Sequence, residues 1–496
     1  MAEIAGRPGK SIDSTKFGFA LLVALIAMIG IGKAVLADTM DPDAFWHFRV
    51  ADQLVREGIG PLVDTLSYAS DKTPWTPYSW LAELVMKRVW DLGGYRATNV
   101  VTAACSGLII VAMAMTCATV AANQVPQLRR SPSYFSAAIA TAIGAYFTLP
   151  FLSFRPVTFA LALLAIIVYL LYRDRARGLR TRAVWIIPLL VLIQTNLHIY
   201  SVFSVAVVML VAIGAFFENR PRFRRLALLA MLTAVAACGT PMLKGMIDTS
   251  VRYNAVDPMV AANFIREMRP FYEGTGGKVS LAIVLMTLGF SIAKRDRLRL
   301  TDWLLLGFGV LVIARLGRFA PVFALISMPI LARVMPALSD RVLGKRLVRF
   351  AMAIVLIIGG VNIARGFPRS DLTLNQWLNR FAPEIPGYPT AAADWALANV
   401  PPSTHRIINE FDWGGYLAWR LGDQWQVLLD GRTQLYAPEF WRQAFFDSPD
   451  AQRALLEKCD ADFAIVPKNR SAFRASLDQL GWKVAYEDDV AAVLVR

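Results

Sequence analysis

The chain has 496 residues, of which 56% are hydrophobic and only 18% are charged, and its mean hydropathy is +0.45. This is more apolar sequence than a soluble core needs, so the composition excludes an ordinary soluble domain and predicts a polytopic membrane protein. The net charge of +15 does not indicate nucleic acid as a partner, because residues 1–366 carry 39 Lys/Arg against 20 Asp/Glu, whereas residues 367–496 carry 13 against 17. The basic excess lies in short loops between apolar runs, where it sets membrane topology.

In chain order, a basic N-terminal segment, residues 1–16, precedes the first of eleven apolar runs. We expect this first run to be an uncleaved membrane span. The basic start and the residues Val35-Leu36-Ala37 also fit a cleavable signal peptide, and cleavage would leave the remaining topology unchanged. The eleven runs lie at 17–37, 97–122, 133–150, 157–172, 183–197, 199–217, 226–240, 278–293, 301–314, 319–338 and 350–366.

Basic clusters between alternate pairs of runs predict the topology. If the N-terminus is cytoplasmic, all 19 basic residues of these clusters lie on the inner side, as the positive-inside rule requires. Loops 38–79 and 241–277 and residues 367–496 then lie on the outer side. We therefore expect a transmembrane domain, residues 17–366, in the bacterial inner membrane, followed by a periplasmic domain. The clusters occupy residues 129–130, 173–182, 220–225, 294–299 and 341–349.

The first outer loop is acidic, with seven Asp/Glu and three Lys/Arg between residues 38 and 79. Asp41 as helix cap and Pro42 in the first turn predict an amphipathic surface helix that ends near Gly58. Interfacial aromatics near Trp75 come next. A second amphipathic helix then extends to the glycine pair 93–94.

Residues 367–496 form mixed polar sequence with turn signals at Gly414-Gly415 and Asp430-Gly431. Short β-branched and aromatic runs alternate with helix-like segments, which predicts a compact α/β domain able to form its own core. The predicted strands are 406–409, 426–429, 463–466, 483–486 and 491–495, and the predicted helices are 390–399, 437–446, 450–458 and 471–480.

Residues 41–47 place two carboxylates and one of the three histidines where the first span reaches the membrane surface. An Asp at the bilayer centre costs about 2.5–3.5 kcal/mol, so Asp41 and Asp43 are expected at or beyond the interface. Such a pair can supply a general base or hold a divalent cation, Mg or Mn, through oxygen ligands. The alternative is structural, with Asp41 capping a helix and Asp43 stabilising its N-terminus. His47 is either a ligand or base, or a hydrogen-bonded interfacial residue.

Other polar residues lie at the outer ends of the predicted spans. Ionisable residues at membrane depth are functional candidates, and acids and bases that converge there can bind a phosphate and move a proton. For the arginines the alternative is a snorkelling anchor, and for the histidine it is a hydrogen-bonded structural role. These candidates are Arg155, His198, Glu267, Arg315 and Arg318.

Together the motifs resemble a family of bacterial multi-pass membrane proteins related to the GT-C superfamily of polyprenyl-phosphate-sugar glycosyltransferases. The resemblance extends from the first outer loop to the tail, so it is more specific than any single motif. The matching segments are residues 41–47, 64–68, 75–81, 196–198, 318–319, 413–417 and 430–436.

The resemblance implies a multi-helix transferase that takes a sugar from a polyprenyl-phosphate carrier on the outer face, with an Asp of the first outer loop as base. This base is Asp41 or Asp43, and the sequence does not choose between them. The family often has a His-Glu pair where this chain has Tyr78-Ser79, which puts a second acid or metal ligand there in doubt. In the tail, Asp430 and Arg432 either line a loop that closes over the acceptor or form a buried pair in a turn.

Two functional hypotheses follow. The first is a glycosyltransferase whose acceptor is a hydroxyl of a cell-envelope glycan, lipid or protein, with inverting attack and with Arg155, Arg315 or Arg318 holding the carrier phosphate. The alternative is a non-catalytic GT-C-like assembly or sensing component that binds a partner through residues 367–496. A transporter fits less well, since no repeat is visible and the polar residues gather on one face.

Overall fold

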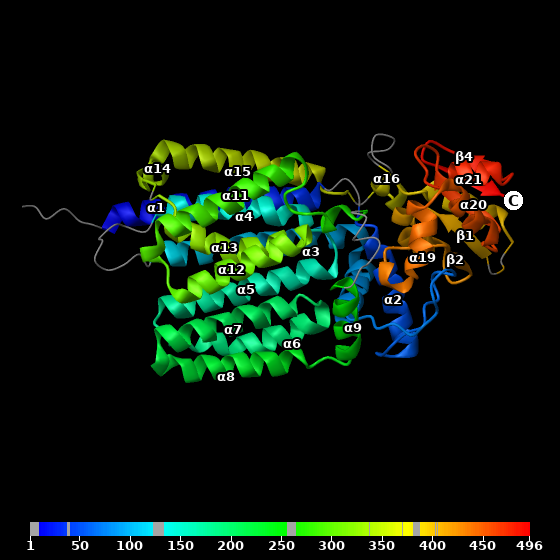
Figure 1. The fold of residues 1–496 in the computed structure, drawn as a ribbon. Coiled ribbons are helices and arrows are strands. Elements are labelled where there is room, and N and C mark those ends of the chain that lie inside the picture. The colour runs from blue at the N-terminus through cyan, green and yellow to red at the C-terminus, as the bar shows by residue number, and fades with distance from the viewer. Residues whose placement is uncertain are drawn as a thin grey trace, which may run out of the picture.

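The computed structural model describes residues 9–36, 40–122, 133–254, 264–336, 338–369, 371–379, 387–401, 403 and 405–496. Figure 1 shows long helices that run roughly parallel to one another, with a smaller mixed domain at one end of this bundle. Helix α1 (Gly9–Val35) begins at the opposite end.

Each of the eleven predicted apolar runs coincides with a helix of the bundle. Within the described residues, eight helical stretches are long and apolar enough to cross a membrane, and Arg182–Leu197 is a shorter apolar stretch. This confirms a polytopic α-helical membrane protein. The other bundle helices are α3 (Trp80–Ala122), α4 (Tyr134–Thr148), α5 (Pro156–Ala176), α6 (Ile187–Leu197), α7 (Ser201–Glu218), α8 (Arg220–Ala237), α11 (Gly274–Ala293), α12 (Leu300–Arg315), α13 (Ala320–Val334) and α15 (Arg346–Gly366).

Helix α3 combines the second amphipathic helix and the second span. Its direction changes at Gly93 and Gly94, where the backbone leaves helical geometry. Gly94 has φ 53 and ψ −145, a conformation that only glycine adopts readily. The helix end predicted at this glycine pair is therefore a kink between two parts of one continuous element.

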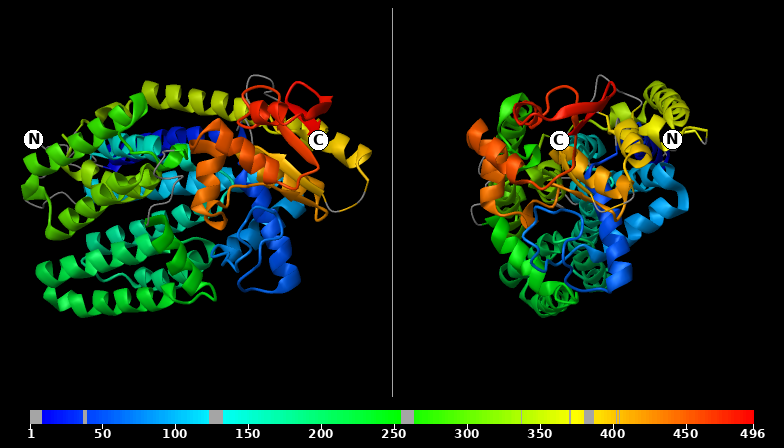
Figure 2. Two further views of the ribbon diagram at one scale, coloured as in Figure 1. Left: turned by 45° about the vertical axis from the view of Figure 1, so that its right-hand side comes forward. Right: turned by 90° about the vertical axis from the view of Figure 1, so that its right-hand side faces the viewer.

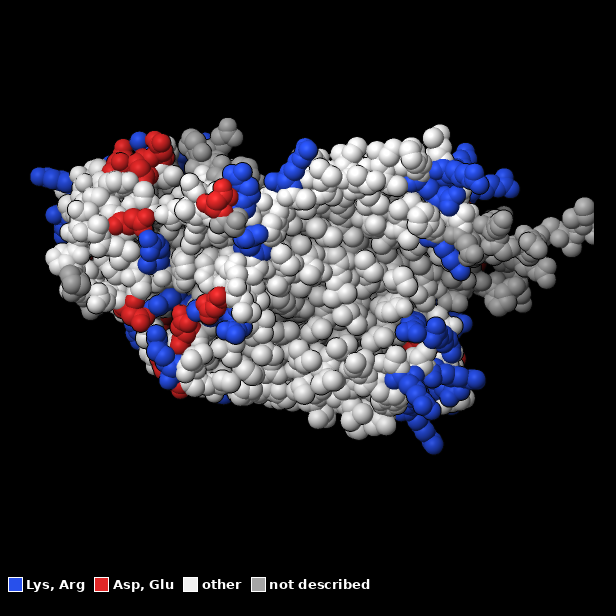
Figure 3. All heavy atoms as spheres, turned by 180° about the vertical axis from the view of Figure 1, so that it is seen from behind, with Lys and Arg blue, Asp and Glu red and all other residues white. Residues whose placement is uncertain are grey.

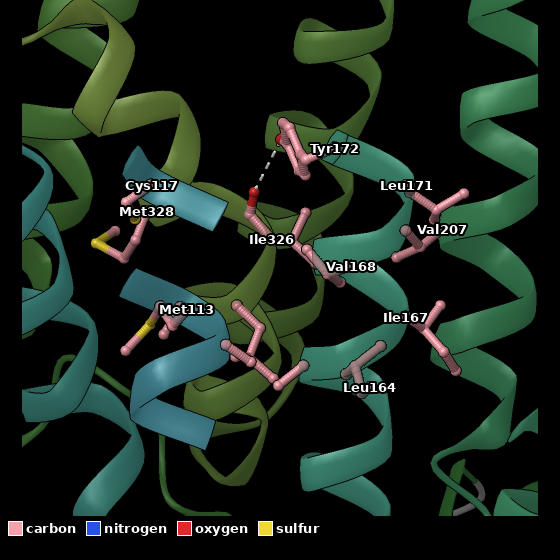
Figure 4. Close-up of a cluster of buried hydrophobic side chains, with 14 of the residues drawn as sticks. Met113, Cys117, Leu164, Ile167, Val168, Leu171, Tyr172, Val207, Ile326 and Met328 are labelled. Atoms are coloured by element: carbon pink, nitrogen blue, oxygen red, sulfur yellow. Dashed lines mark hydrogen bonds between the residues drawn. The ribbon is translucent and has the colours of Figure 1, made fainter. Parts of the chain in front are cut away.

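Figure 4 shows how the centre of the bundle packs, with side chains of α3, α5, α7 and α13 meeting between the helices. Every residue of α13 except Arg333 is buried. Cys117 is a buried free thiol in this core. The labelled side chains are Met113, Cys117, Leu164, Ile167, Val168, Leu171, Tyr172, Val207, Ile326 and Met328.

Charge is distributed unequally along the bundle. Figure 3 shows Lys and Arg gathered at the end of the bundle away from the C-terminal domain, a wide uncharged belt in the middle, and mixed acidic and basic residues at the other end. An uncharged belt of this kind is the surface that a bilayer covers.

The C-terminal domain contains a five-stranded sheet in the order β2-β1-β3-β5-β4. Strands β2, β1 and β3 are parallel, and β5 is antiparallel to β3 and β4. All five predicted strands are present, whereas the turn predicted at Gly414-Gly415 is wrong, because these glycines begin helix α18. The strands are β1 (His405–Asn409), β2 (Trp425–Val427), β3 (Phe463–Pro467), β4 (Lys483–Glu487) and β5 (Ala491–Val495).

Shorter helices complete the outer end and the connections. Helix α2 (Asp43–Glu57) corresponds to the amphipathic helix predicted to end near Gly58, and it packs against the C-terminal domain. Helix α9 (Leu243–Asn254) lies between residues 241 and 277, where the sequence predicted no helix. The remaining elements are α14 (Arg341–Gly344), α16 (Leu374–Leu378), α17 (Thr390–Asn399), α18 (Gly414–Leu421), α19 (Pro438–Trp441), α20 (Pro449–Lys458), α21 (Arg474–Gln479), η1 (Leu149–Phe151), η2 (Arg182–Ile186), η3 (Arg266–Met268), η4 (Arg295–Arg297), η5 (Gly317–Phe319), η6 (Phe411–Trp413), η7 (Thr433–Leu435) and the π-helical η8 (Arg442–Phe446).

The first outer loop and the C-terminal domain share one hydrophobic core, and Figure 2 shows α2 beside the C-terminal segments in both views. Phe45 of α2 has its ring 5.2 Å from the rings of both Tyr388 and Tyr416. The loop also covers the free edge of β2, because the Val427 N–H donates to the Leu66 carbonyl at 2.9 Å. A covered edge strand cannot pair with another chain.

Candidate active site

A cavity of about 1730 Å³ lies between the C-terminal domain and the end of the bundle opposite the start of α1. Its wall combines the start of α2, the turns that precede α5, α7 and α13, and loops of the C-terminal domain. The sequence-predicted residues that line it are Asp41, Asp43, His47, Arg155, His198, Glu267 and Arg318.

Arg155 lies at the centre of a carboxylate cluster in this cavity. Its guanidinium pairs with Asp43, and its Nη1 donates to Glu267 Oε1 at 2.7 Å. Its Nε is 3.6 Å from Asp41 Oδ2. The single positive charge of Arg155 therefore lies among three carboxylates, so this guanidinium has little capacity to bind a further anion.

The turn that carries Arg155 is fixed from two other elements. Arg155 directly precedes α5 and has an extended backbone, φ −141 and ψ 157. Two residues earlier, Ser153 Oγ donates to Asp41 Oδ2 at 2.7 Å. Lys33 of α1 donates to carbonyls of the same turn, including that of Leu152 at 3.2 Å. The guanidinium is thus positioned by contacts to α1 and to the first outer loop.

The two first-loop carboxyls have opposite pKa shifts. Burial raises the pKa of Asp41 and outweighs the lowering effect of Arg155. For Asp43, burial is outweighed by Arg155 and by the Trp46 Nε1–H, which donates to Oδ1 at 3.0 Å, so the pKa lies below its usual range. The pKa of Glu267 is also lowered, because Arg155 outweighs the effect of burial. Among these three carboxyls, Asp41 is therefore the one best suited to accept a proton.

Asp41 also has the capping role that was its structural alternative. Its Oδ1 accepts the backbone N–H of Asp43 at 3.1 Å, at the start of α2. Because a carboxylate has two oxygens, the other oxygen, Oδ2, can still accept from Ser153 and lie next to Arg155. The cap and the position in the cavity wall are therefore compatible.

Arg318 and His198 form a second polar group in the cavity wall. Arg318 belongs to η5, between α12 and α13, and His198 ends α6. The Tyr200 N–H donates to His198 Nδ1 at 3.3 Å, so the proton of the neutral imidazole is on Nε2. Burial, with Arg318 and Arg155, holds the pKa of His198 well below its usual value. A cation and a neutral donor lie together here, as anion binding requires.

His47 has the opposite hydrogen-bonding character. Its Nδ1 is 3.0 Å from Glu83 Oε2, and Ser79 Oγ donates to Glu83 Oε1 at 3.1 Å. His47 and Glu83 are both buried, with 4% and 1% of their surface exposed. Because the carboxylate accepts from Nδ1–H, the Nε2 of the neutral imidazole is a hydrogen-bond acceptor, unlike that of His198.

Asp430 and Arg432 do not line the cavity, and the prediction that they bind substrate is replaced by the alternative of a buried pair. Arg432 Nη2 is 2.5 Å from Asp430 Oδ2 and 2.8 Å from Asp64 Oδ1. The side chains of Arg432 and Asp430 are 0% exposed, and that of Asp64 is 2% exposed. The guanidinium also lies 5.5 Å from the centre of the Trp75 ring. This ion triad joins the first outer loop to the C-terminal domain.

Two tail glycines bring that domain into contact with the first outer loop. A Cβ on Gly431 would lie 2.0 Å from Asp43 Oδ1, and a Cβ on Gly415 would lie 2.8 Å from the Pro42 carbonyl oxygen. At such distances a side chain would have to displace its neighbour. The two distinctive tail motifs therefore make contacts within the chain, next to the carboxylates.

Arg315 is exposed at the end of α12 and is absent from the cavity wall. It lies only three residues from Arg318, but the turn at residues 316–317 separates them. The prediction that Arg315 is a substrate-binding residue is therefore not supported by its position, which fits the snorkelling alternative.

Several site residues were not predicted from the sequence. Glu83 is one polar residue on an amphipathic helix, and no local pattern links it to His47. Ser153 and Lys33 position Arg155, but an isolated serine in a turn and a lysine near the end of a span carry no specific signal. Asp64 was noticed only as part of a matching segment.

A divalent cation does not fit the residues present. In the described parts of the chain, no group of three or more His, Cys, Asp or Glu side chains is arranged to hold a metal ion. The oxygens of Asp43 and Glu267 point to Arg155, which supplies the positive charge in this cluster. A hard cation such as Mg²⁺ needs oxygen ligands from several sides.

Comparison with solved structures identifies the fold. The chain is similar to the oligosaccharyltransferase AglB from Archaeoglobus fulgidus in complex with an inhibitory peptide and a dolichol-phosphate, with TM-score 0.52, 12% identity and coverage of 90% of this chain and 69% of that chain. The apo form of the Archaeoglobus fulgidus oligosaccharyltransferase gives TM-score 0.51, 11% identity and coverage of 94% and 70%. The chain therefore shares its overall fold with these oligosaccharyltransferase structures.

ArnT from Cupriavidus metallidurans bound to undecaprenyl phosphate is also similar, with TM-score 0.43, 13% identity and coverage of 96% of this chain and 98% of that chain. No protein-family model and no curated protein sequence matches the chain. The multi-helix membrane fold that the resemblance implied is confirmed by the bundle helices and by the similarity of fold to the Archaeoglobus fulgidus oligosaccharyltransferase.

Proposed function

We propose that the protein is a glycosyltransferase of the bacterial inner membrane that transfers a sugar from a polyprenyl-phosphate carrier to a cell-envelope acceptor on the outer side. The observation that carries this proposal is one cavity that contains a carboxyl with a raised pKa, Asp41, and an anion-binding group, Arg318 with His198. The similarity of fold to AglB, whose structure contains a dolichol-phosphate, supports the same class of reaction. The basic end of the bundle in Figure 3 supports a cytoplasmic N-terminus.

Transfer needs a base for the acceptor hydroxyl and a partner for the departing phosphate. Asp41 takes the proton while the acceptor oxygen attacks the anomeric carbon. The bond from this carbon to the phosphate oxygen breaks, and its electron pair leaves on the phosphate. Arg318 and the His198 Nε2–H bind that phosphate and stabilise its charge. Attack from the face opposite the phosphate inverts the anomeric centre.

Arg155 has a different role in this proposal from the one that the sequence suggested. It already binds Asp43 and Glu267, so we assign it to holding the carboxylates in place rather than to holding the carrier. Asp43 in turn orients Trp46 and Arg155. The apolar part of the cavity wall, which includes Val202 and Phe319, fits the first isoprenyl units of a carrier.

Carrier binding provides the first test. Removing the guanidinium in Arg318→Ala should weaken retention of polyprenyl phosphate about 10- to 100-fold, because a hydrogen bond to a charged group contributes about 1.5–3 kcal/mol. Native mass spectrometry of purified protein, with polyprenyl phosphate added, measures the retained fraction. Arg315→Ala is the matched control, since this arginine lies outside the cavity. Equal loss in both variants, or no retention by the wild type, would contradict the proposal.

The contact between Gly431 and Asp43 gives a second expectation. In Gly431→Ala the new methyl group must displace the Asp43 carboxylate, since their separation would be only 2.0 Å. We expect sugar transfer to fall at least about tenfold, as sub-ångström placement of a site residue is disturbed, with the fold retained. Gly60→Ala, where a Cβ meets nothing within 4 Å, should transfer normally. A rate of sugar transfer equal to that of the wild type in Gly431→Ala would show that the close contact between Gly431 and Asp43 does not affect transfer.

A non-catalytic assembly component remains the alternative function. That hypothesis assumed that the distinctive tail motifs form a surface that binds a partner. Those motifs pack against Pro42 and Asp43 within the same chain, so they favour the transferase.

A further inference from the structure

The sheet of the C-terminal domain presents one edge to the cavity. Strands β2, β1 and β3 are parallel, so their carboxyl ends meet at this edge, where the β4–β5 turn also lies. In open α/β sheets, ligands bind outside the carboxyl ends of the parallel strands. The cavity-wall residues that follow these strand ends are Glu410 to Trp413 after β1, Gly431, Thr433 and Gln434 after β2, Asn469 and Arg470 after β3, and Asp489 and Val490 in the β4–β5 turn.

Four polar side chains at this strand-end edge differ from those around Arg155, because they make no polar contact with the described residues. Asp412, Asn469, Arg470 and Asp489 are all exposed and line the cavity. None of the four makes a hydrogen bond or ion pair with another residue that the structure describes. Their donors and acceptors are therefore available to a ligand in the cavity.

Arg470 adds backbone strain to this edge. It has φ 60, in the left-handed region where a residue with a Cβ is disfavoured by about 1–2 kcal/mol. Non-glycine residues in such conformations cluster at functional sites, where the surrounding structure maintains them. This conformation sets the position of the loop after β3, and with it that of Asn469 and Arg470, in the cavity wall.

We propose that the strand-end edge is the acceptor subsite and that its occupant is a carbohydrate chain. This inference rests on the proposed function. The carboxylates of Asp412 and Asp489 accept hydrogen bonds from sugar hydroxyls, the amide of Asn469 donates and accepts, and the guanidinium of Arg470 donates. The partly buried ring of Phe411 in the same wall provides a flat apolar face for the C–H face of a sugar ring.

The balance of charge narrows the class of carbohydrate. Glu410, Asp412 and Asp489 line this wall, and Arg470 is the one basic residue among the described residues of the wall. The nearby carboxylate of Asp43 interacts electrostatically with Asp412, and like charges repel each other, so additional negative charge is unfavourable there. A neutral or amino-bearing glycan therefore fits this edge better than one rich in uronate or phosphate groups.

The test uses full-length protein in cells that depend on it, with two readouts for each variant. Native mass spectrometry measures the retained polyprenyl phosphate, both bare and sugar-bearing, and mass spectrometry of the cell envelope measures the transferred sugar and its linkage. We expect Asp412→Ala and Arg470→Ala to lower the product at least tenfold and to retain both carrier forms normally. Asp460→Ala, an exposed acid at the opposite edge of the sheet, is the matched control and should behave as the wild type.

Three results would overturn this inference. Unchanged product in both edge variants would show that the edge does not bind the acceptor. Loss of the sugar-bearing carrier alone would show that the edge binds the donor's own sugar. A transferred sugar linked to a protein side chain or directly to a lipid would exclude a carbohydrate acceptor. Absence of any carrier from the wild type is a separate result, because it rejects the proposed function itself.

Discussion

Replacing Asp41 with asparagine is expected to lower the rate of sugar transfer by about 10²- to 10⁴-fold, the usual contribution of a general base. The carboxamide keeps the size of the side chain, its oxygen can still accept from the Asp43 N–H, and its NH2 group can donate to Ser153 Oγ, but it cannot take up a proton. The carrier, which we assign to Arg318 and His198, should remain bound. Transfer is measured with purified protein in detergent or vesicles.

The pH dependence of transfer distinguishes a base from a structural cap. Burial raises the pKa of Asp41, and the base is active only when ionised. The wild-type rate should therefore fall as the pH is lowered through this raised pKa, starting at a higher pH than for an exposed aspartate. Asp41→Asn should lack this acidic limb. Asp52→Asn, an acid on the same first loop outside the cavity wall, is the control. A fast Asp41→Asn variant would exclude Asp41 as the base.

Replacing Arg432 with methionine should destabilise the protein by about 3–5 kcal/mol, because it leaves Asp64 and Asp430 buried without a counter-charge. The expected result is a fall in the melting temperature of several degrees in thermal unfolding in detergent. Loss of the contact between the first outer loop and the C-terminal domain should accompany it, visible as faster proteolysis of both segments.

A nearby arginine provides the comparison. Arg442 pairs with Glu439 on the surface, with 55% and 54% of the side chains exposed, and such pairs contribute about 0–1 kcal/mol. Arg442→Met should therefore change the melting temperature little. Similar stability of Arg432→Met and Arg442→Met would contradict the view that the ion triad joins the two parts.

Local patterns predicted most of the fold. Apolar runs marked the bundle helices, and alternating β-branched residues marked the five strands, because both periodicities follow directly from burial of one face or of a whole element. The turn predicted at Gly414-Gly415 was wrong. The two glycines are required because residues 42 and 429–430 lie too close for a Cβ, and not because the backbone turns there, since both residues are helical. Helix α9 was missed because its sequence is only weakly apolar.

The site was predicted less completely, because its key contacts join residues that are far apart in the sequence. Asp41, Asp43 and Arg155 were selected as polar residues at span ends, but not their mutual pairing. The partnership of His47 with Glu83 and that of Arg432 with Asp64 depend on how whole elements dock. Asp41 could be preferred to Asp43 as the base only once the position of Arg155 was known, and no spacing in the sequence shows that position.

The shared core of the first outer loop and the C-terminal domain has a consequence for biosynthesis. Tyr388 donates to the Met40 carbonyl across 348 residues of chain, and Ser67 donates to the Leu428 carbonyl across 361. A ribosome therefore makes the carboxylate-bearing loop early, but the residues that enclose it are made only after the last span. The nascent chain carries an unfinished cavity throughout its insertion. Under the proposed function, sugar transfer therefore begins only when translation has passed the sheet, and an incomplete molecule does not consume carrier-linked sugar.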